Sequence, residues 1–522
     1  MHQRFYKPAL TSRPALAVTA FVVSFLLLFA SGRMSSGDAT EQLRVALLIV
    51  NKGTLSSPEE IPAWIQGPDH RYYEPHDLGN TVLMLPAALL GSCLSKGTAA
   101  DKIASPPVLT RIGVAFTYAI FSAIGALLVY QLFALTFSTR TAFLLSAGFV
   151  MTTMYWPYSK TAWDVMGGCV CMCALLYLCG KIPLVPRPRL YVILAAAAFA
   201  LACTFRYSLG IFAGLAFAVY LFLQRRKVRF SDYLMSALTG FTVLVPTFAY
   251  NWLRMGNPLR PGTTAPVYLN GNNALNGNVF HGLFGLFFAP NRGLFLYSPV
   301  LLLIFLLPFY WKHVPRPTRG LVLTFLPGAL LYSLLIARMQ NWGAFGWGPR
   351  YLLPVLPIFG VAVAPVAVAL WRSRFRPAFA ALVIASAALT VPPVLVNWHL
   401  ATVESETAWN QDVGFPSQQI AVWHGLWLGI HGKPLPVSQK SREAAEDPAR
   451  SGANRFPDFW LVRLGEHSAG GRIVAWAITL MLLSINGAAL AGIFRRPDRS
   501  GDAVQGTRPP KTAQVKTATV GT

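Results

Sequence analysis

Charged residues are scarce in this chain, and this scarcity decides its class. They make up 12% of the 522 residues, whereas 54% of the residues are hydrophobic. Soluble domains carry about 25% charged residues. An ordinary water-soluble protein is therefore excluded, and a chain that crosses a membrane many times is indicated.

Acidic residues are scarcer still, because 20 Asp and Glu stand against 44 Lys and Arg. The basic residues do not form one patch. They lie at the ends of apolar segments, which is the positive-inside pattern of membrane proteins. No module of interleaved basic and aromatic residues accompanies them, so we predict no nucleic-acid partner.

Cysteine is also rare, and five of the six cysteines lie within apolar segments, which argues against a disulfide framework. Cys169 and Cys173 share a helix face, but a zinc site needs four ligands and these two have no evident partners. We interpret them as small packing residues and predict no metal site. The sequence also lacks a P-loop, a nucleophile elbow and a dinucleotide fingerprint.

The sequence is instead rich in long apolar runs. They predict an all-α polytopic membrane protein with about twelve transmembrane helices and further helices on its external surface. The first run resembles a secretory signal, but its apolar core is longer than usual, and we interpret it as an uncleaved helix. Two runs are short and need support from neighbours or a thinner bilayer. The predicted spans are 14–32, 108–137, 141–156, 163–180, 190–204, 207–224, 233–252, 294–311, 320–337, 351–371, 377–397 and 473–494.

The connections between these spans predict the orientation. With both termini in the cytoplasm, the short basic connections lie inside and the long ones outside. The segment from Leu78 to Leu94 is apolar enough to be mistaken for a further span. A crossing there would invert every later loop, so we predict a helix that lies on or dips into the outer face. The predicted external connections are 33–107, 253–293, 338–350 and 398–472.

These connections also suggest how the chain is divided. We predict a transmembrane core that includes the first external loop, a later external loop or small folded cap, a last transmembrane helix, and a disordered basic tail in the cytoplasm. The corresponding ranges are 1–397, 398–472, 473–494 and 495–522.

Asp38 is the leading candidate for chemistry. It follows the first span and opens an amphipathic stretch that we expect to lie along the external surface. A carboxylate at a helix N-terminus also serves as a cap. The functional alternative is a general base, which removes the proton from an acceptor hydroxyl as the hydroxyl attacks the anomeric carbon of a sugar. Both roles are compatible.

Cationic and aromatic candidates lie at other external positions. Arg71 and His76 flank Tyr72 and Tyr73 in the first external loop, where they suit either phosphate binding or a polar membrane surface. Further candidates lie at the ends of spans. Arg206 interrupts apolar sequence on both sides, which indicates either a functional residue or one that snorkels to the interface. The other span-end candidates are Lys160, Trp347 and Arg350.

Three short motifs resemble the GT-C superfamily of polytopic glycosyltransferases. More narrowly, they resemble the bacterial members related to protein O-mannosyltransferases and the lipid A aminoarabinose transferase. The first departs from many relatives, which carry Asp-Glu, because Ala39 follows Asp38 here. The motifs are Ser36-Gly37-Asp38 with the helix to Leu55, Arg71-Tyr72-Tyr73-Glu74-Pro75-His76-Asp77-Leu78-Gly79 running into Leu83-Met84-Leu85-Pro86, and Gly348-Pro349-Arg350-Tyr351-Leu352-Leu353-Pro354.

This resemblance implies an inverting glycosyltransferase of a bacterial inner membrane that uses a polyprenyl-phosphate-linked sugar from the external face. The expected acceptor is a glycan, a glycolipid or a protein. Asp38 would act as the base. Arg206 and Arg350, with Lys160, His76 and Arg71, would bind the donor phosphate. Tyr72, Tyr73 and Trp347 would contact the sugar or the acceptor. Cationic side chains can neutralise one phosphate, so no cofactor is required, although a divalent metal is not excluded.

Two other functions stay open on the sequence. An O-antigen-ligase or polymerase type of enzyme would place its chemistry in the late external loop, where His399, His424 and His431 lie. A transporter or flippase would make no bond. Such carriers place ionisable residues near the middle of the membrane, whereas the charges here gather at the ends of the spans.

Overall fold

The computed structural model describes residues 13–34, 37–265, 274–343, 346–404, 415–435 and 456–495. Over these ranges 75% of the residues are helical and strands are few, which confirms the all-α class. Two-residue strands β1 (Ile65–Gln66) and β2 (Tyr72–Tyr73) form an antiparallel pair, with Ile65 opposite Tyr73 and Gln66 opposite Tyr72. The tail from 496 onward lies outside the described residues.

Seven helical segments of the described ranges are long and apolar enough to cross a membrane. A helix suits lipid because it satisfies its backbone groups internally. Several begin with proline in the first turn, where the missing N–H costs nothing. The segments are α5 (Val108–Ala134), α8 (Asp164–Lys181) extended to Leu184, α11 (Phe230–Met255), α16 (Arg316–Arg338), η5 (Arg350–Val355) with α17 (Leu356–Trp371), α18 (Arg376–Leu395) and α24 (Ala469–Phe494).

The other five predicted spans also coincide with helical structure, but of shorter length. The segment predicted at 141–156 ends early, at Met151, and 294–311 is a series of short helices. Pro299 and Pro308 divide that series because neither can donate a backbone hydrogen bond. The count of twelve crossings stays a prediction. The shorter elements are α1 (Arg13–Leu28), α6 (Thr139–Met151), α9 (Arg189–Phe205), α10 (Leu209–Leu223), α14 (Leu294–Tyr297), η3 (Pro299–Leu306) and α15 (Leu307–Tyr310).

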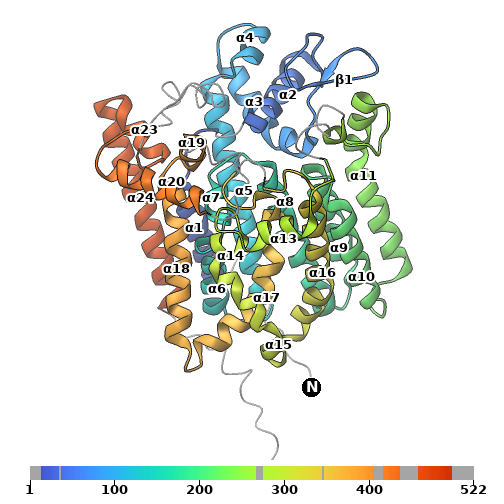
Figure 1. Ribbon diagram of the computed structural model, residues 1–522, viewed down its shortest axis with the longest axis vertical. Helices are drawn as coiled ribbons and strands as arrows, with labels where there is room; N and C mark the ends of the chain where they lie inside the picture. The colour runs from blue at the N-terminus through green and yellow to red at the C-terminus, as the bar shows by residue number, and fades with distance from the viewer. Residues whose placement is uncertain are drawn as a thin grey trace, which may run out of the picture.

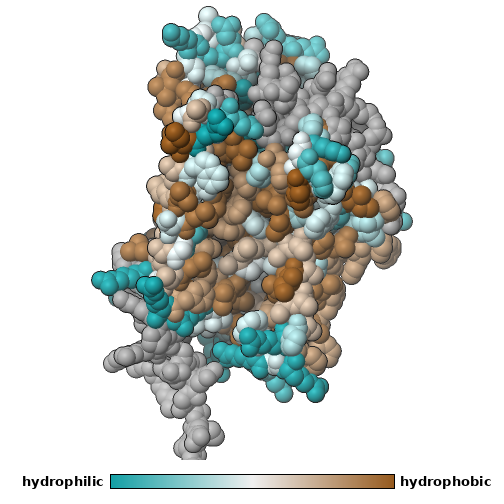
Figure 2. Space-filling view, turned by 90° about the vertical axis from the view of Figure 1, so that its left-hand side faces the viewer, coloured by the Kyte–Doolittle hydropathy of each residue, from teal (hydrophilic) through white to brown (hydrophobic). Residues whose placement is uncertain are grey.

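Polar surface gathers at the two ends of the molecule. Figure 2 shows an apolar belt between hydrophilic ends, as a multi-pass membrane protein requires. In Figure 1, α15 and the turn between α17 and α18 lie at the lower end, whereas α2 (Gly37–Lys52) and β1 lie at the upper end. These elements of the long and the short connections thus lie at opposite ends of the molecule, and which end faces outward stays a prediction.

We call residues 37–104 the head. It contains α2, the two strands, α3 (Leu78–Leu94) and α4 (Ala99–Ala104). Leu43 and Leu47 of α2 pack against Met84 and Ala87 of α3, and all four are buried. Burying one leucine side chain contributes about 1.5 to 3 kcal/mol, so this seam holds α2 in place. Figure 1 shows α2, α3 and α4 together at the upper end.

Candidate active site

Asp38 lies in the first turn of α2, where the head meets the membrane helices. Its Oδ2 atom lies 3.7 Å from Nη2 of Arg350 and 3.9 Å from Nε2 of His76. The Asp38 side chain is 39% exposed, so one side of the carboxylate is open to an incoming group. Three residues from distant parts of the chain therefore share one site.

The charges at this site set the protonation of both titrating groups. Burial by itself would raise the pKa of Asp38, but the positive charges of His76, Arg350 and Arg206 outweigh it and lower the pKa. Burial opposes the charged form of His76, yet the neighbouring carboxylates of Glu74 and Asp38 raise its pKa to about 10. At neutral pH the site holds a carboxylate and an imidazolium.

A buried polar contact fixes the helix that carries Asp38. Gln42, one turn further along α2, accepts a hydrogen bond from Asn80 of α3 at 2.5 Å. The Tyr118 hydroxyl of α5 donates to the same Asn80 side chain. Because all three side chains are buried, breaking the network would leave polar atoms without partners. The position of Asp38 is thus tied to two further helices.

Arg206 belongs to the same site through a second carboxylate. It ends α9, and its Nη1 atom lies 2.9 Å from Oδ2 of Asp164, in the first turn of α8. Asp164 was not among the predicted site residues. A carboxylate in the first turn of a helix is ordinary because it suits the helix dipole, so nothing in the sequence pointed to the partner of Asp164.

Aromatic rings hold the two arginines in one column. The guanidinium of Arg206 lies 4.5 Å from the ring centroid of Tyr351, and that of Arg350 lies 5.2 Å from the same ring. Arg350 also lies 4.4 Å from the ring centroid of Trp163. Cation–π contacts use the flat face of a guanidinium. The N–H groups at its edge can therefore make hydrogen bonds, as Nη1 of Arg206 does with Asp164.

Arg254 of α11 holds the segment that carries His76. This buried guanidinium donates to the carbonyls of Glu74 and His76 at 3.1 and 2.6 Å. It also pairs with Asp77 at 3.4 Å. The other Asp77 oxygen accepts the backbone N–H of Tyr207 at 2.9 Å, next to Arg206. The Asp77 carboxylate therefore connects the segment that carries His76 to the residue next to Arg206.

Three of the predicted binding residues instead build the head. Arg71 donates to Oγ1 of Thr54 at 3.3 Å. Tyr72 pairs through its backbone with Gln66 in the small sheet. The Tyr73 hydroxyl donates to Asp69 at 2.8 Å. These contacts lie within the head rather than around Asp38, which differs from the predicted phosphate and sugar binding.

Lys160 is also placed differently from its prediction. Its ammonium group is buried and lies 2.9 Å from Oδ2 of Asp458, which also pairs with Arg33 and Arg463. The same ammonium donates to the carbonyls of Val394 and Val396 at 2.7 and 3.1 Å. These contacts use its three donors, so the Lys160 ammonium has no donor left for a phosphate.

Trp347 is fully buried, so its ring has no surface to offer a sugar. It packs edge-on against Tyr297, with ring centroids 4.7 Å apart, and its carbonyl accepts the Tyr158 hydroxyl at 2.9 Å. Trp347 therefore anchors the residues just before Arg350 to Tyr158 and Tyr297. Tryptophans at a membrane–water interface commonly form an aromatic belt, but full burial of Trp347 does not fit that role.

His399 is a further neighbour that the sequence did not single out for this site. Its ring is buried beside Trp398 and Trp163. Burial lowers its pKa to about 3, the charges of Arg33 and Arg350 act in the same direction, and the charge of Asp38 opposes them. His399 is therefore neutral, in contrast to His76.

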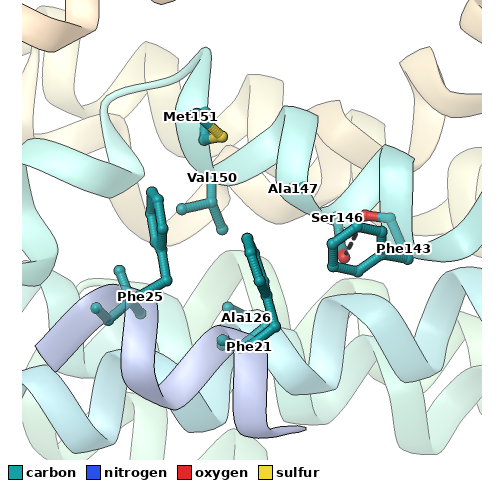
Figure 3. Close-up of a pocket in the computed structure, with 10 residues that line it drawn as sticks. Phe21, Phe25, Ala126, Phe143, Ser146, Ala147, Val150 and Met151 are labelled. Carbon is teal, nitrogen blue, oxygen red and sulfur yellow. Dashed lines mark hydrogen bonds between the residues drawn. The ribbon is translucent and has the colours of Figure 1, made fainter. Parts of the chain in front are cut away.

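Metal ligands and an apolar pocket are the remaining candidates. Within the described ranges, no group of three or more His, Cys, Asp or Glu is arranged to hold a metal ion. The pocket in Figure 3 lies between α1, α5 and α6 and is lined by side chains such as Phe21, Phe25 and Phe143. None of its lining residues is titratable, so this pocket offers no group for acid–base chemistry.

The fold and the site define a multi-pass membrane protein with ionised side chains clustered where its head meets the helices. No family model and no curated protein matches the chain. Solved structures similar to it include ArnT from Cupriavidus metallidurans bound to undecaprenyl phosphate, at 15% identity and a TM-score of 0.47, over 78% of this chain and 74% of that one. Its apo structure matches over 91% and 71% at 14% identity and a TM-score of 0.47.

An archaeal protein is similar as well. The oligosaccharyltransferase AglB from Archaeoglobus fulgidus, in complex with an inhibitory peptide and a dolichol-phosphate, matches over 90% of this chain and 68% of that one, at 12% identity and a TM-score of 0.43. Both proteins are glycosyltransferases of the GT-C superfamily, the group that the sequence motifs resemble. At such TM-scores the likeness assigns no role to any residue.

Proposed function

We propose that the protein is an inverting glycosyltransferase that moves a sugar from a polyprenyl-phosphate donor to an acceptor hydroxyl. The observation that carries the proposal is the placement of the Asp38 carboxylate within 4 Å of Arg350 and His76. A base beside cationic groups is what the reaction needs. The base accepts the proton of the nucleophile, and the cations stabilise the phosphate that leaves.

The proposed reaction is a single displacement. The acceptor hydroxyl loses its proton to Asp38 as its oxygen attacks the anomeric carbon of the sugar. The bond between that carbon and the phosphate oxygen breaks, and its electron pair leaves with the polyprenyl phosphate. Because attack and departure occur on opposite faces, the anomeric configuration inverts. Arg350, Arg206 and the imidazolium of His76 would balance the charge that the phosphate gains.

Two orphaned N–H groups support a phosphate at this site. The Nε atoms of Arg206 and Arg350 are buried, and neither has a hydrogen-bond partner within the part of the chain that the structure describes. Leaving a buried donor of a charged group unpaired costs more than about 1 to 3 kcal/mol. A phosphate oxygen is a strong acceptor that these groups can share.

The lipid of the donor would lie along α3. This helix begins two residues after His76 and exposes an apolar face made of Val82, Leu89, Leu90 and Leu94. Burying apolar surface contributes roughly 25 cal/mol per Å², so a polyprenyl chain on this face would add affinity without chemical selectivity. The phosphate end would then reach the arginines.

The proposed setting is the inner membrane of a bacterium, with the head on the external face and both termini in the cytoplasm. The short basic connections at the opposite end support this orientation. A lipid-linked donor is reached at the membrane surface, where Asp38 lies. The proposed acceptor is a glycan, a glycolipid or a protein that carries a free hydroxyl.

Transfer activity of an Asp38→Asn variant tests the proposal. Purified protein in detergent is incubated with a polyprenyl phosphate that carries a radiolabelled sugar and with a membrane extract as acceptor source. The loss of a general base lowers the rate by about 10² to 10⁴-fold, and Asn keeps the size of the side chain.

Asp101→Asn is the matched control, because Asp101 also lies in the first turn of a head helix, and its carboxylate accepts hydrogen bonds from Thr98 rather than facing Arg350 or His76. We expect this variant to transfer sugar at the wild-type rate. An Asp38→Asn protein with full activity would contradict the proposed role of Asp38.

A further inference from the structure

Gln418, at the start of α20 (Ser417–Ile430), is buried and grips the turn that precedes Arg350. Its Nε2 donates to the carbonyl of Gly346 at 2.9 Å. Its Oε1 accepts the backbone N–H of Gly348 at 3.0 Å and the Tyr297 hydroxyl at 3.0 Å. The Gln418 amide thus donates to one backbone group of the turn and accepts from another.

The turn needs this support because its conformation is special. Gly346 and Gly348 have φ angles of +153° and +59°, which residues other than glycine rarely adopt. A Cβ atom on Gly346 would lie 2.9 Å from Cδ of Arg350. The backbone N–H of Arg350 donates to the Gly348 carbonyl at 2.9 Å. The turn therefore fixes both the backbone of Arg350 and the space along its side chain.

Asn291 holds Gln418 in its turn. The Asn291 Oδ1 atom accepts the backbone N–H of Gln418 at 3.2 Å and the Ser417 hydroxyl at 3.0 Å. The Tyr297 hydroxyl contacts the Asn291 carbonyl as well as Gln418. Because Asn291 and Tyr297 are buried, the start of α20 is anchored to the body of the protein on both sides of Gln418.

We infer that Gln418 is a positioning residue that sets the geometry of Arg350 relative to Asp38. The inference rests on the proposed function for its effect on transfer, since Arg350 would bind the donor phosphate. The late region of the chain then contributes to the site by holding an arginine in place. Moving a binding group by about 1 Å can cost on the order of 10²-fold in rate. Loss of the Gln418 hydrogen bonds to this turn should therefore affect transfer through Arg350.

Hydrogen exchange of the turn tests, without any substrate, whether the Gln418 side chain stabilises it. Gln418→Leu removes the amide and keeps most of the side-chain volume. We expect faster exchange in peptides that cover 346–351, as followed by mass spectrometry. The control is Gln419→Leu, because Gln419 is also buried but makes no side-chain hydrogen bond within the described residues. Unchanged exchange in the Gln418→Leu protein would overturn the inference.

Donor binding tests the consequence. In the Gln418→Leu protein we expect the KM for the donor to rise by on the order of tenfold, with a smaller change in kcat. In an Arg350→Ala background the same substitution should add no further loss, because it acts through Arg350. The Gln419→Leu protein should keep the wild-type KM.

The outcomes separate the two proposals. A loosened turn with an unchanged donor KM overturns the positioning role and leaves the glycosyltransferase proposal intact. An additive loss in the Arg350→Ala background also overturns it, since Gln418 would then act elsewhere. Full transfer by the Asp38→Asn protein refutes the proposed function, and the exchange experiment then still reports whether Gln418 holds the turn.

Discussion

Charge balance around Asp38 explains how one carboxylate can be both ionised and basic. Asp38, Glu74 and Asp164 face three cations, His76, Arg206 and Arg350, so the site is close to neutral. A donor phosphodiester would add one negative charge and draw the arginines toward itself. Asp38 would then lose part of the attraction that lowers its pKa and would become a better base. Donor binding would thus prepare the base.

His76 is the residue through which this balance can be tested by pH. His76→Gln removes a cation that lowers the pKa of Asp38, so the pKa of Asp38 should rise. A base works only when deprotonated, and the acid limb of the kcat/KM profile should therefore move to higher pH. We also expect kcat/KM to fall by about 10- to 100-fold, because the donor phosphate would lose the charge-assisted hydrogen bond that His76 is proposed to supply.

The direction of the change in kcat/KM at high pH follows from the raised pKa of His76. Its charge is present at pH 7 and is lost as the pH rises through about 10, so the alkaline limb of the wild-type profile should weaken there. His424→Gln is the control, because His424 is exposed and stacks on Trp427 of α20. A larger loss in His424→Gln than in His76→Gln would favour the ligase type of enzyme, whose chemistry lies in the late loop.

At the scale of elements, a buried ion cluster joins the end of the chain to its beginning. Asp458 accepts from Arg33, which follows α1, and from Lys160, which follows α7 (Tyr155–Ser159). It also accepts from Arg463 of α23 (Trp460–His467). Figure 1 shows α24 running beside α1. This cluster therefore ties the last span to the core.

Asp458→Asn should destabilise the protein strongly. The substitution keeps the shape of the side chain but leaves three cations, each less than 15% exposed, without their shared counter-charge. Removing one partner of a buried ion pair costs about 3 to 5 kcal/mol. We expect a clear fall in the Tm of the purified protein in detergent.

A second buried carboxylate provides the comparison for that measurement. Asp232 pairs with Arg189, whose side chain is 59% exposed and can turn to water. Asp232→Asn should therefore lower the Tm less than Asp458→Asn does. Equal shifts would mean that the cluster around Asp458 contributes nothing beyond ordinary burial of a carboxylate.

The sequence predicted those features that depend on the membrane itself. Apolar runs become helices because lipid offers the backbone no partner, and charged span ends on one side meet because the bilayer aligns them. Asp38, Arg206 and Arg350 are found together for that reason. Which buried charge pairs with which partner was not predictable. The pairing of Lys160 with Asp458, 298 residues apart, is the clearest example.

At the scale of the whole molecule, sidedness decides whether the site can work. The head and the turn between α17 and α18 lie at opposite ends of the apolar belt (Figures 1 and 2). Placing Asp38 with the external donor requires the head to face outward and that basic turn to face the cytoplasm. The chain offers a direct way to measure this, because Cys93 is the exposed cysteine and the other five are buried.

Single cysteines at the two ends should react from opposite sides of the membrane. In a Cys93→Ser background, Lys96→Cys places a thiol on the exposed surface of the head, and Arg374→Cys places one in the turn after α17. In intact spheroplasts, an impermeant maleimide should label the first and spare the second. Inverted vesicles should give the opposite pattern. If Lys96→Cys reacts only in inverted vesicles, Asp38 lies on the cytoplasmic side, where an externally presented donor cannot reach it, and the transferase would have to act on a cytoplasmic pool.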